Sequence, residues 1–224
     1  MSRPPFEYPT VAMSEEEVER EREVYGGLAA AVRRLNETSL RSTVGEEGVR
    51  EARELIERAT ARLGEQAIPG HFGVQLTTGG RVRGHGNAVV GLRNPIAVPL
   101  QITQDHDAGR ATAEFELNAL YEGPPGMVHG GVSALVLDQI CGEAAAAGGH
   151  PGMTGTLSLR YRRPTPLGRC SAAGWLDSFD GVKATVKAEL RRADGEVTVT
   201  AEGLFILPRW AREELAKARP PQYE

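Results

Sequence analysis

One long and almost wholly apolar segment, GGVSALVLDQICGEAAAA at residues 130–147, constrains the fold of this chain most strongly. It is predicted to form a helix, and the segments around it have a different hydrophobic periodicity. In VKATVKAEL, residues 182–190, apolar and polar side chains alternate, which is typical of a strand with one buried and one wet face. A helix of this kind among such strands predicts an α+β domain.

The other strand candidates repeat this period-two pattern. They are separated by the turn sequences DHDAG, PTPLG, DSFDG and RADG, and they occupy residues 111–119, 154–162, 170–177 and 196–206, with IAVPLQIT at 96–103 as a shorter candidate. The predicted order is two strands, the helix, and four strands joined by tight turns. Such connections indicate an antiparallel sheet of five or six strands with the helix laid across it.

The sequence pattern of the N-terminal third is typical of helices instead. From Ser14 to about Gln66 it predicts two helices, with Ser14 as the N-cap of the first and an apolar stripe along the second. These helices are expected to pack on the main domain or on a partner subunit, or to form a lid. We therefore divide the chain into a helical extension (1–68), a glycine-rich linker with a short hairpin (69–94), the α+β domain (95–210) and a tail (211–224).

Composition excludes some classes of function. The chain has 224 residues, a formal charge of -4 and a sequence pI near 5.8, which leave no basic footprint for nucleic acid. No apolar stretch is long enough for a membrane span, and the N-terminus lacks a signal-peptide core, so a cytoplasmic protein is expected. Cys141 and Cys170 have no metal-ligand spacing and are predicted to be buried free thiols.

Asp138 is the one acid in the middle of the apolar helix that shares a face with apolar residues. Its neighbours at helical spacing are Leu135 and Cys141. Burying an ionised carboxylate without partners costs several kcal/mol, so such a group is kept for a structural hydrogen bond or for chemistry. Both alternatives stay open on this pattern alone.

The residues before the helix favour chemistry. Gly130 and Gly131 place bare backbone amides at a helix N-terminus, where negative charge is stabilised. His129 lies about 13 Å from Asp138 along a helix at 1.5 Å per residue, so the two cannot meet directly within one helix. Either a substrate reaches along the helix, or a second subunit brings its helix alongside.

The stretch EGPPGMVHGGVSALVLD, with the later GMTGTLSLRYRRPTPLG, resembles the hotdog-fold acyl-CoA thioesterases, in the phenylacetyl-CoA thioesterase-like (PaaI-like) branch with a PPG-x-x-HGG motif. The resemblance covers about residues 95–208. It implies a hotdog fold, in which the sheet wraps around the central helix, and a homodimer, possibly a tetramer, with antiparallel central helices. It implies an acyl-CoA substrate and neither a metal nor a redox cofactor.

Residue roles follow from the same resemblance. Gly130, with Gly131 beside it, would polarise the thioester carbonyl, and Asp138 of the opposite subunit would act as general base or nucleophile. Thr154 would orient Asp138 or the attacking water. His129 would orient the glycine turn or contact the thioester.

Two further expectations concern substrate binding. The strand-ending arginines Arg162 and Arg163 would meet the phosphates of CoA. Many relatives carry an Asn six residues before the His, where this chain has Gly123. The acyl group itself is not predicted by the sequence.

Two other functions compete with hydrolysis. One is a hotdog dehydratase or hydratase, whose chemistry needs a His and an acid at one carbon, an arrangement that the sequence does not favour. The other is a non-catalytic acyl-CoA-binding or assembly module that docks through the N-terminal helices.

Overall fold

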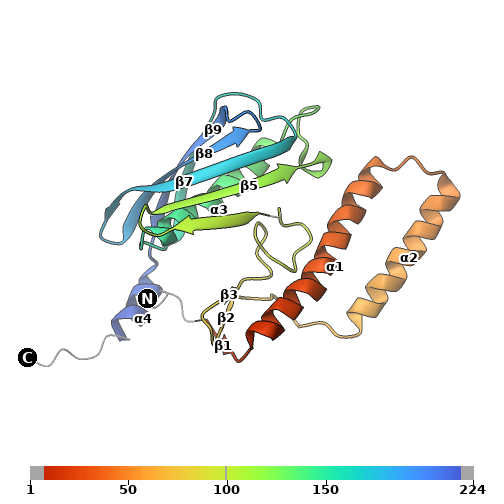
Figure 1. Ribbon diagram of the computed structural model, residues 1–224, viewed down its shortest axis with the longest axis horizontal. Helices are drawn as coiled ribbons and strands as arrows, with labels where there is room; N and C mark the ends of the chain where they lie inside the picture. The colour runs from red at the N-terminus through yellow and green to blue at the C-terminus, as the bar shows by residue number, and fades with distance from the viewer. Residues whose placement is uncertain (1–7, 99, 218–224) are drawn as a thin grey trace, which may run out of the picture. The chain divides into compact units, whose positions relative to one another are not determined.

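The computed structural model describes residues 8–98 and 100–217, in two compact units (Figure 1). The larger unit holds the described residues from Ile96 onward with Ala88–Val90, Tyr8 and Pro9, and the smaller holds Thr10–Asn87 with Gly91–Pro95. Parts of the predicted extension and tail, residues 1–7 and 218–224, lie outside the described residues. Within the described residues, no helix is long and apolar enough to cross a bilayer.

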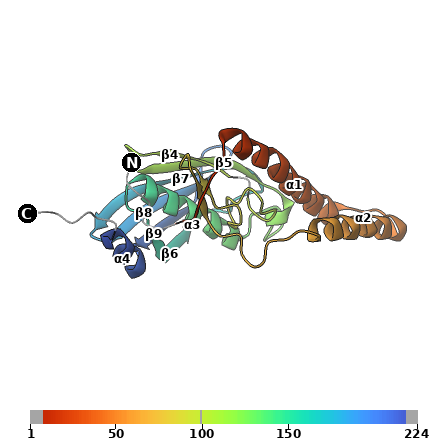
Figure 2. The same ribbon diagram turned by 90° about the horizontal axis from the view of Figure 1, so that it is seen from below.

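A six-stranded antiparallel sheet and one central helix form the larger unit. Its strands, in the order β4-β5-β7-β8-β9-β6, are β4 (Gln101–Asp105), β5 (Arg110–Leu117), β7 (Gly168–Asp180), β8 (Lys183–Arg192), β9 (Val197–Ile206) and β6 (Met153–Tyr161). Helix α3 (Gly130–Ala147) lies along one face of the sheet (Figures 1 and 2). A short 3-10 helix, η1 (Ala119–Tyr121), precedes α3, and α4 (Arg209–Lys217) follows β9. The predicted helix and antiparallel sheet are therefore confirmed.

The connection from β6 to β7 differs from the prediction. Tight turns were expected to join all four strands after the helix, but β6 pairs with β9 and β7 pairs with β5 and β8. The connecting segment contains Pro164 and Pro166, which cannot donate a ladder hydrogen bond and so disfavour a hairpin there. As a result β6 forms one edge of the sheet, beside α3.

The core of the larger unit is formed where α3 meets the inner face of the sheet. The helix buries a continuous apolar face that includes Val136, Leu137, Ile140, Cys141 and Ala144. Gly174 of β7 allows this close approach, because a Cβ there would come within 2.9 Å of the Ile140 side chain and 3.1 Å of its carbonyl oxygen. The helix is thereby held firmly against the sheet.

Truncation of this core should be costly. Leu137 is fully buried, so we expect Leu137→Ala to lower the free energy of unfolding by about 2–5 kcal/mol, through lost transfer energy and a residual cavity. The matched change Leu120→Ala, in η1 and 37% exposed, should cost less than about 1 kcal/mol. Chemical denaturation at one protein concentration measures both, and equal losses would contradict this packing.

The smaller unit contains the two predicted N-terminal helices, α1 (Glu15–Arg41) and α2 (Glu46–Gly64). Ser14 caps α1 as predicted: its hydroxyl accepts from the Glu17 amide, while the Glu17 carboxylate accepts from the Ser14 amide. Strand β1 (Thr10–Val11) pairs with β2 (Gln75–Thr77), and β2 forms with β3 (Val82–Arg83) the short hairpin expected in the glycine-rich segment.

A half-buried charge cluster ties α1 to β3 within this smaller unit. The Glu21 carboxylate accepts from the Arg83 guanidinium at 2.6 Å and lies 3.1 Å from Nε2 of His85. Burial by itself raises the pKa of Glu21, but hydrogen bonds from Arg83 and His85 outweigh burial and lower it. The Arg93 guanidinium stacks 3.5 Å from the centre of the Tyr25 ring beside this cluster.

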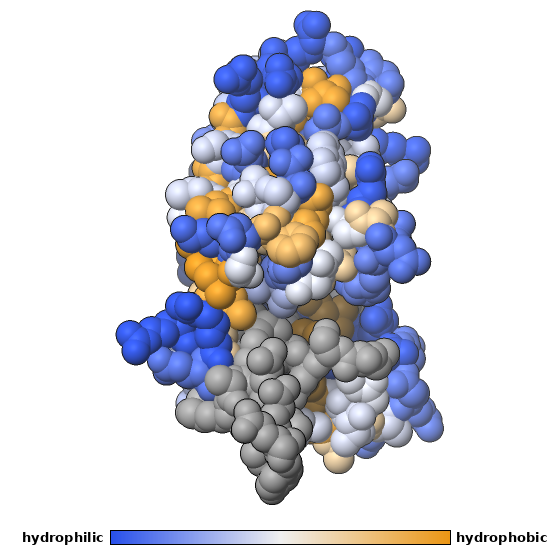
Figure 3. Space-filling view, turned by 90° about the vertical axis from the view of Figure 1, so that its left-hand side faces the viewer, coloured by the Kyte–Doolittle hydropathy of each residue, from blue (hydrophilic) through white to orange (hydrophobic). Residues whose placement is uncertain are grey.

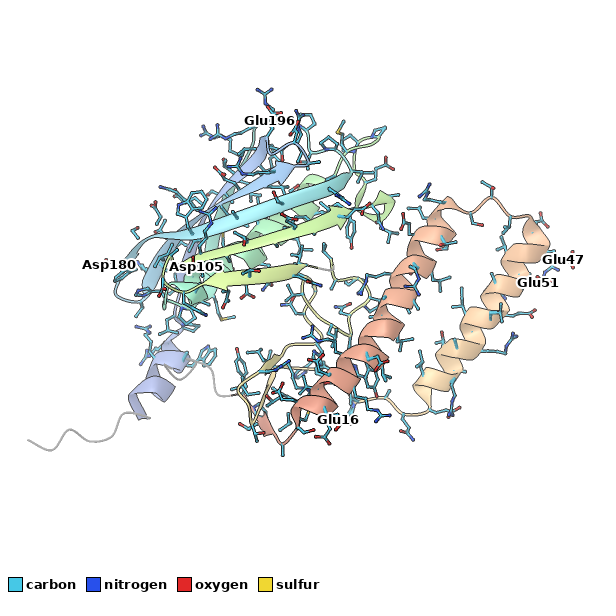
Figure 4. All side chains as sticks on the ribbon, in the orientation of Figure 1. Glu16, Glu47, Glu51, Asp105, Asp180 and Glu196 are labelled. Atoms are coloured by element: carbon cyan, nitrogen blue, oxygen red, sulfur yellow. The ribbon has the colours of Figure 1, made fainter. Side chains whose placement is uncertain are left out.

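Helix α2 carries the apolar stripe that the sequence predicted. It buries none of its residues, and Val49, Leu55, Ile56 and Leu63 are all exposed. Glu47 and Glu51 lie on the same helix (Figure 4). The stripe is therefore uncovered within the described chain.

The end of the sheet that carries Asp105 and Asp180 presents a mixed surface (Figures 3 and 4). Hydrophobic residues stand there among hydrophilic ones, and Met153, Phe179 and Val182 are exposed. The His150 ring stacks on Phe179, with centroids 3.9 Å apart.

Candidate active site

The start of α3 presents one free backbone donor. His129 is the N-cap, and its Nδ1 accepts a hydrogen bond from the Gly131 amide at 3.0 Å. The Gly130 amide, by contrast, has no acceptor among the described residues. The two glycine amides, expected to act side by side, are thus not equivalent: Gly131 holds the histidine and Gly130 faces outward with the helix dipole behind it.

The glycine-proline turn before α3 determines where His129 stands. The His129 amide donates to the Tyr121 carbonyl at 2.9 Å, and the Gly123 amide donates to the Met127 carbonyl at 2.9 Å. At position 123 a Cβ would come within 2.8 Å of the His129 Cα, so no side chain fits there in this backbone. Glycine at position 123 therefore has a local steric reason.

A second group of site residues lies further along the helix. The Thr154 hydroxyl donates to Oδ1 of Asp138 at 2.8 Å. Asp138 is half-buried, on the side of α3 that the sheet leaves uncovered, and is less desolvated in the single chain than its apolar neighbours suggested. The structure thus brings together two predicted residues, a carboxylate and a hydroxyl that donates to it.

Strand β6 supplies side chains to both groups because it contains a bulge. Thr154 pairs with Phe205 and Thr156 pairs with Leu204, so Gly155 is the extra residue. The bulge shifts the alternation by one, which places Thr154 and Tyr161 on the same face of the strand. Thr154 reaches Asp138, while the Tyr161 hydroxyl donates to the Gly130 carbonyl at 2.8 Å.

Sequence reasoning missed Tyr161 as a site residue. Its contact depends on the edge position of β6 and on the bulge at Gly155, and neither is visible in the alternation of one sequence. The only available signal was the glycine itself, which often marks a bulge inside a strand pattern.

The two groups stay apart within one chain. Gly130 and Asp138 are eight residues apart on one continuous helix, which corresponds to about 12 Å of rise at 1.5 Å per residue. The uncovered side of α3 carries Gly131, Leu135 and Asp138, and Leu135 is 40% exposed there. A carbonyl bound at Gly130 therefore cannot be reached directly by the carboxylate of the same helix.

Neither of the two cysteines is placed to react readily. Both are buried free thiols, as predicted. Burial, with the nearby Asp138 charge, raises the pKa of Cys141 to about 12, and burial raises that of Cys170 to about 11. Neither thiol supplies a nucleophile at neutral pH.

The predicted substrate-binding arginines both follow β6. Arg163 is paired with Glu196, whereas Arg162 donates to the Thr200 hydroxyl at 3.3 Å and has no ion-pair partner among the described residues. In the turn at 104–107 the Asp105 carboxylate makes local hydrogen bonds, in which it accepts from the amides of Asp107 and Ala108. That turn is ordinary hairpin structure.

Known proteins resemble this chain in sequence and fold. The Thioesterase superfamily matches residues 125–199, which include the start of α3, Asp138 and β6. A crystal structure of a thioesterase superfamily protein superimposes with a TM-score of 0.73 and 35% sequence identity, covering 88% of this chain and 98% of the other.

Two curated relatives carry the name acyl-coenzyme A thioesterase THEM4. The Bos taurus protein is 29% identical over 120 residues, covering 52% of this chain and 48% of its own length. The Xenopus laevis protein is 33% identical over 102 residues, covering 43% of this chain and 45% of its own. The chain thus spans about half the length of the curated relatives it matches.

The six-stranded antiparallel sheet around α3 is a hotdog fold, as the sequence predicted. With a match over nearly the whole of a solved member, the chain belongs to the thioesterase superfamily.

Proposed function

We propose that this protein hydrolyses an acyl-CoA thioester to the free acid and CoA. The observation that carries the proposal is that α3 presents two groups suited to this chemistry. One is the free Gly130 amide at its start, and the other is the Asp138 carboxylate, which accepts a hydrogen bond from Thr154. Relatives named acyl-coenzyme A thioesterases support the substrate class. The PPGMVHGG sequence at residues 124–131 supports a place in the PaaI-like branch.

In the proposed reaction the thioester carbonyl oxygen accepts from the Gly130 amide. The His129 Nδ1 is already an acceptor, so the neutral ring carries its proton on Nε2 and offers a second donor from an exposed side chain. Asp138 takes a proton from water as the water oxygen bonds to the acyl carbon. The tetrahedral oxyanion is stabilised at the helix N-terminus, and the carbon-sulphur bond then breaks, with the proton passing to the CoA thiolate.

The separation of the two groups along α3 supports a homodimer. An antiparallel partner helix laid on the uncovered side of α3 would bring its Asp138 to this chain's Gly130. Gly131 and Leu135 are exposed on that side, and Leu135 provides apolar surface to bury. The edge strand β6 has no partner strand on its outer side among the described residues, so it is available to pair across the same two-fold axis.

Contact with the CoA phosphates is assigned to the end of β6. Arg162 is the stronger candidate, because Glu196 already neutralises Arg163. Gly131 acts indirectly in this scheme, by holding His129.

A thiol-release assay tests the function. Phenylacetyl, other aryl and medium-chain acyl-CoAs are each incubated with the protein and a thiol-reactive dye, and release of CoA from at least one is expected. Cys141 and Cys170 are both buried, which limits their reaction with the dye. Binding without release would instead identify a non-catalytic acyl-CoA-binding module, and hydration of crotonyl-CoA faster than thiol release would identify a hydratase.

A further inference from the structure

The peptide group between Gly130 and Gly131 is hydrogen-bonded by a side chain at each end. On one side the Tyr161 hydroxyl donates to its carbonyl oxygen at 2.8 Å. On the other its N–H donates to Nδ1 of His129 at 3.0 Å. The three residues are thus linked through one peptide plane at the mouth of the site.

The glycine at 130 leaves room for this arrangement. A Cβ on Gly130 would lie 3.3 Å from the Tyr161 hydroxyl oxygen and 3.4 Å from the ring, which is tighter than ordinary van der Waals contact. The tyrosine ring therefore lies directly against the bare α-carbon. Tyr161 is anchored by its chain neighbour, because the Arg162 amide donates to the Thr198 carbonyl at 2.8 Å.

Polarisation passes along such a chain of bonds. A donor on a peptide carbonyl makes the N–H of the same peptide a better donor, since hydrogen bonds in series strengthen one another. A stronger N–H bond at Gly131 favours the His129 tautomer whose Nδ1 is bare and whose Nε2 carries the proton. Fixing the peptide plane also fixes the direction of the imidazole.

We propose that Tyr161 is a positioning residue, which acts through the Gly130–Gly131 peptide to hold His129 with its Nε2–H available to the substrate carbonyl. The role in catalysis rests on the proposed thioesterase function. The claim about the tautomer does not, because it concerns the free protein.

The test variant is Tyr161→Phe, which removes only the hydroxyl. Ring 15N chemical shifts of His129 are measured at a pH of about 8, where an ordinary histidine is neutral, and are assigned by their loss in His129→Asn. The native protein should show the single Nε2–H tautomer, and Tyr161→Phe a mixture of both. Tyr25→Phe removes a hydroxyl from α1 in the other unit and should change neither the shifts nor the rate.

Kinetics provide the second readout. We expect Tyr161→Phe to lower kcat about 10-fold, with KM changed less than about two-fold. In the His129→Asn background, where Asn can still cap the helix, the same change should cost less than about two-fold, because the residue through which Tyr161 acts is gone.

The outcomes separate the two claims. An identical tautomer in the native protein and Tyr161→Phe overturns the positioning role, whatever the rates. Equal losses of kcat with and without His129 also overturn it. If the native protein hydrolyses no acyl-CoA, the proposed function fails, while the 15N shifts still decide whether Tyr161 sets the tautomer.

Discussion

Asp138→Asn should lower kcat for acyl-CoA hydrolysis by about 10²–10⁴-fold, the contribution typical of a positioned general base. Asn keeps the size of the side chain, and its Oδ1 can still accept from the Thr154 hydroxyl, so the local structure should persist. The loss is therefore expected in kcat, with the fold and the proposed dimer intact. Thiol release at saturating substrate, circular dichroism and light scattering measure the three quantities.

Glu143→Gln is the matched control, because Glu143 is a second half-buried acid on α3. Its carboxylate accepts from the side-chain amides of Gln104 and Gln139 and takes no part in the proposed site. We expect its kcat to stay within about three-fold of the native value, a change of less than 1 kcal/mol in the barrier. A native rate in Asp138→Asn would remove Asp138 from the mechanism.

Gly130→Pro should lower kcat by about 10²–10³-fold, because it removes one N–H donor from the proposed oxyanion hole. Proline is well tolerated at the first position of a helix, where the amide has no intrahelical partner. The preceding residue is also compatible: His129 has φ -62° and ψ 133°, within the region that proline requires of the residue before it. The substitution thus deletes the donor with little change of backbone.

Gly130→Ala separates the donor from the added side chain. Alanine places a Cβ in the same tight space beside Tyr161 but keeps the N–H. We expect it to lose at most about 10-fold, through displacement of the tyrosine hydroxyl. If alanine and proline reduce kcat equally, crowding of Tyr161 explains the loss and the amide is not the oxyanion donor.

Most of the larger unit could be predicted because local pattern and tertiary burial agree there. The apolar run at 130–147 becomes α3 with the same bounds, and the alternation of VKATVKAEL places Ala184, Val186 and Ala188 in the core. Ser14 caps α1 for the local reason that its sequence suggested. Such features depend on residues that are close in the chain.

The remainder depends on long-range placement. Pro164 and Pro166 disfavour a hairpin between β6 and β7, but nothing local in residues 162–167 indicates that β7 lies between β5 and β8. The bulge at Gly155 decides which side chains of β6 face α3, and through it the structure adds Tyr161 to the site. The engagement of the Gly131 amide by His129 is a further detail of geometry that residue identity alone did not reveal.

The central claim is that each active site takes its glycine turn from one subunit and its Asp138 from the other. A heterodimer of Gly130→Pro and Asp138→Asn, purified through two different affinity tags, tests it most directly. In such a dimer one composite site has both native residues and the other has neither.

The measurement is the rate of CoA release per heterodimer. If the sites are shared, the heterodimer should recover about half of the native activity, because one of two equivalent sites is whole. If each site is built within one chain, both sites carry a defect, and activity no higher than that of the two parent variants would contradict the account.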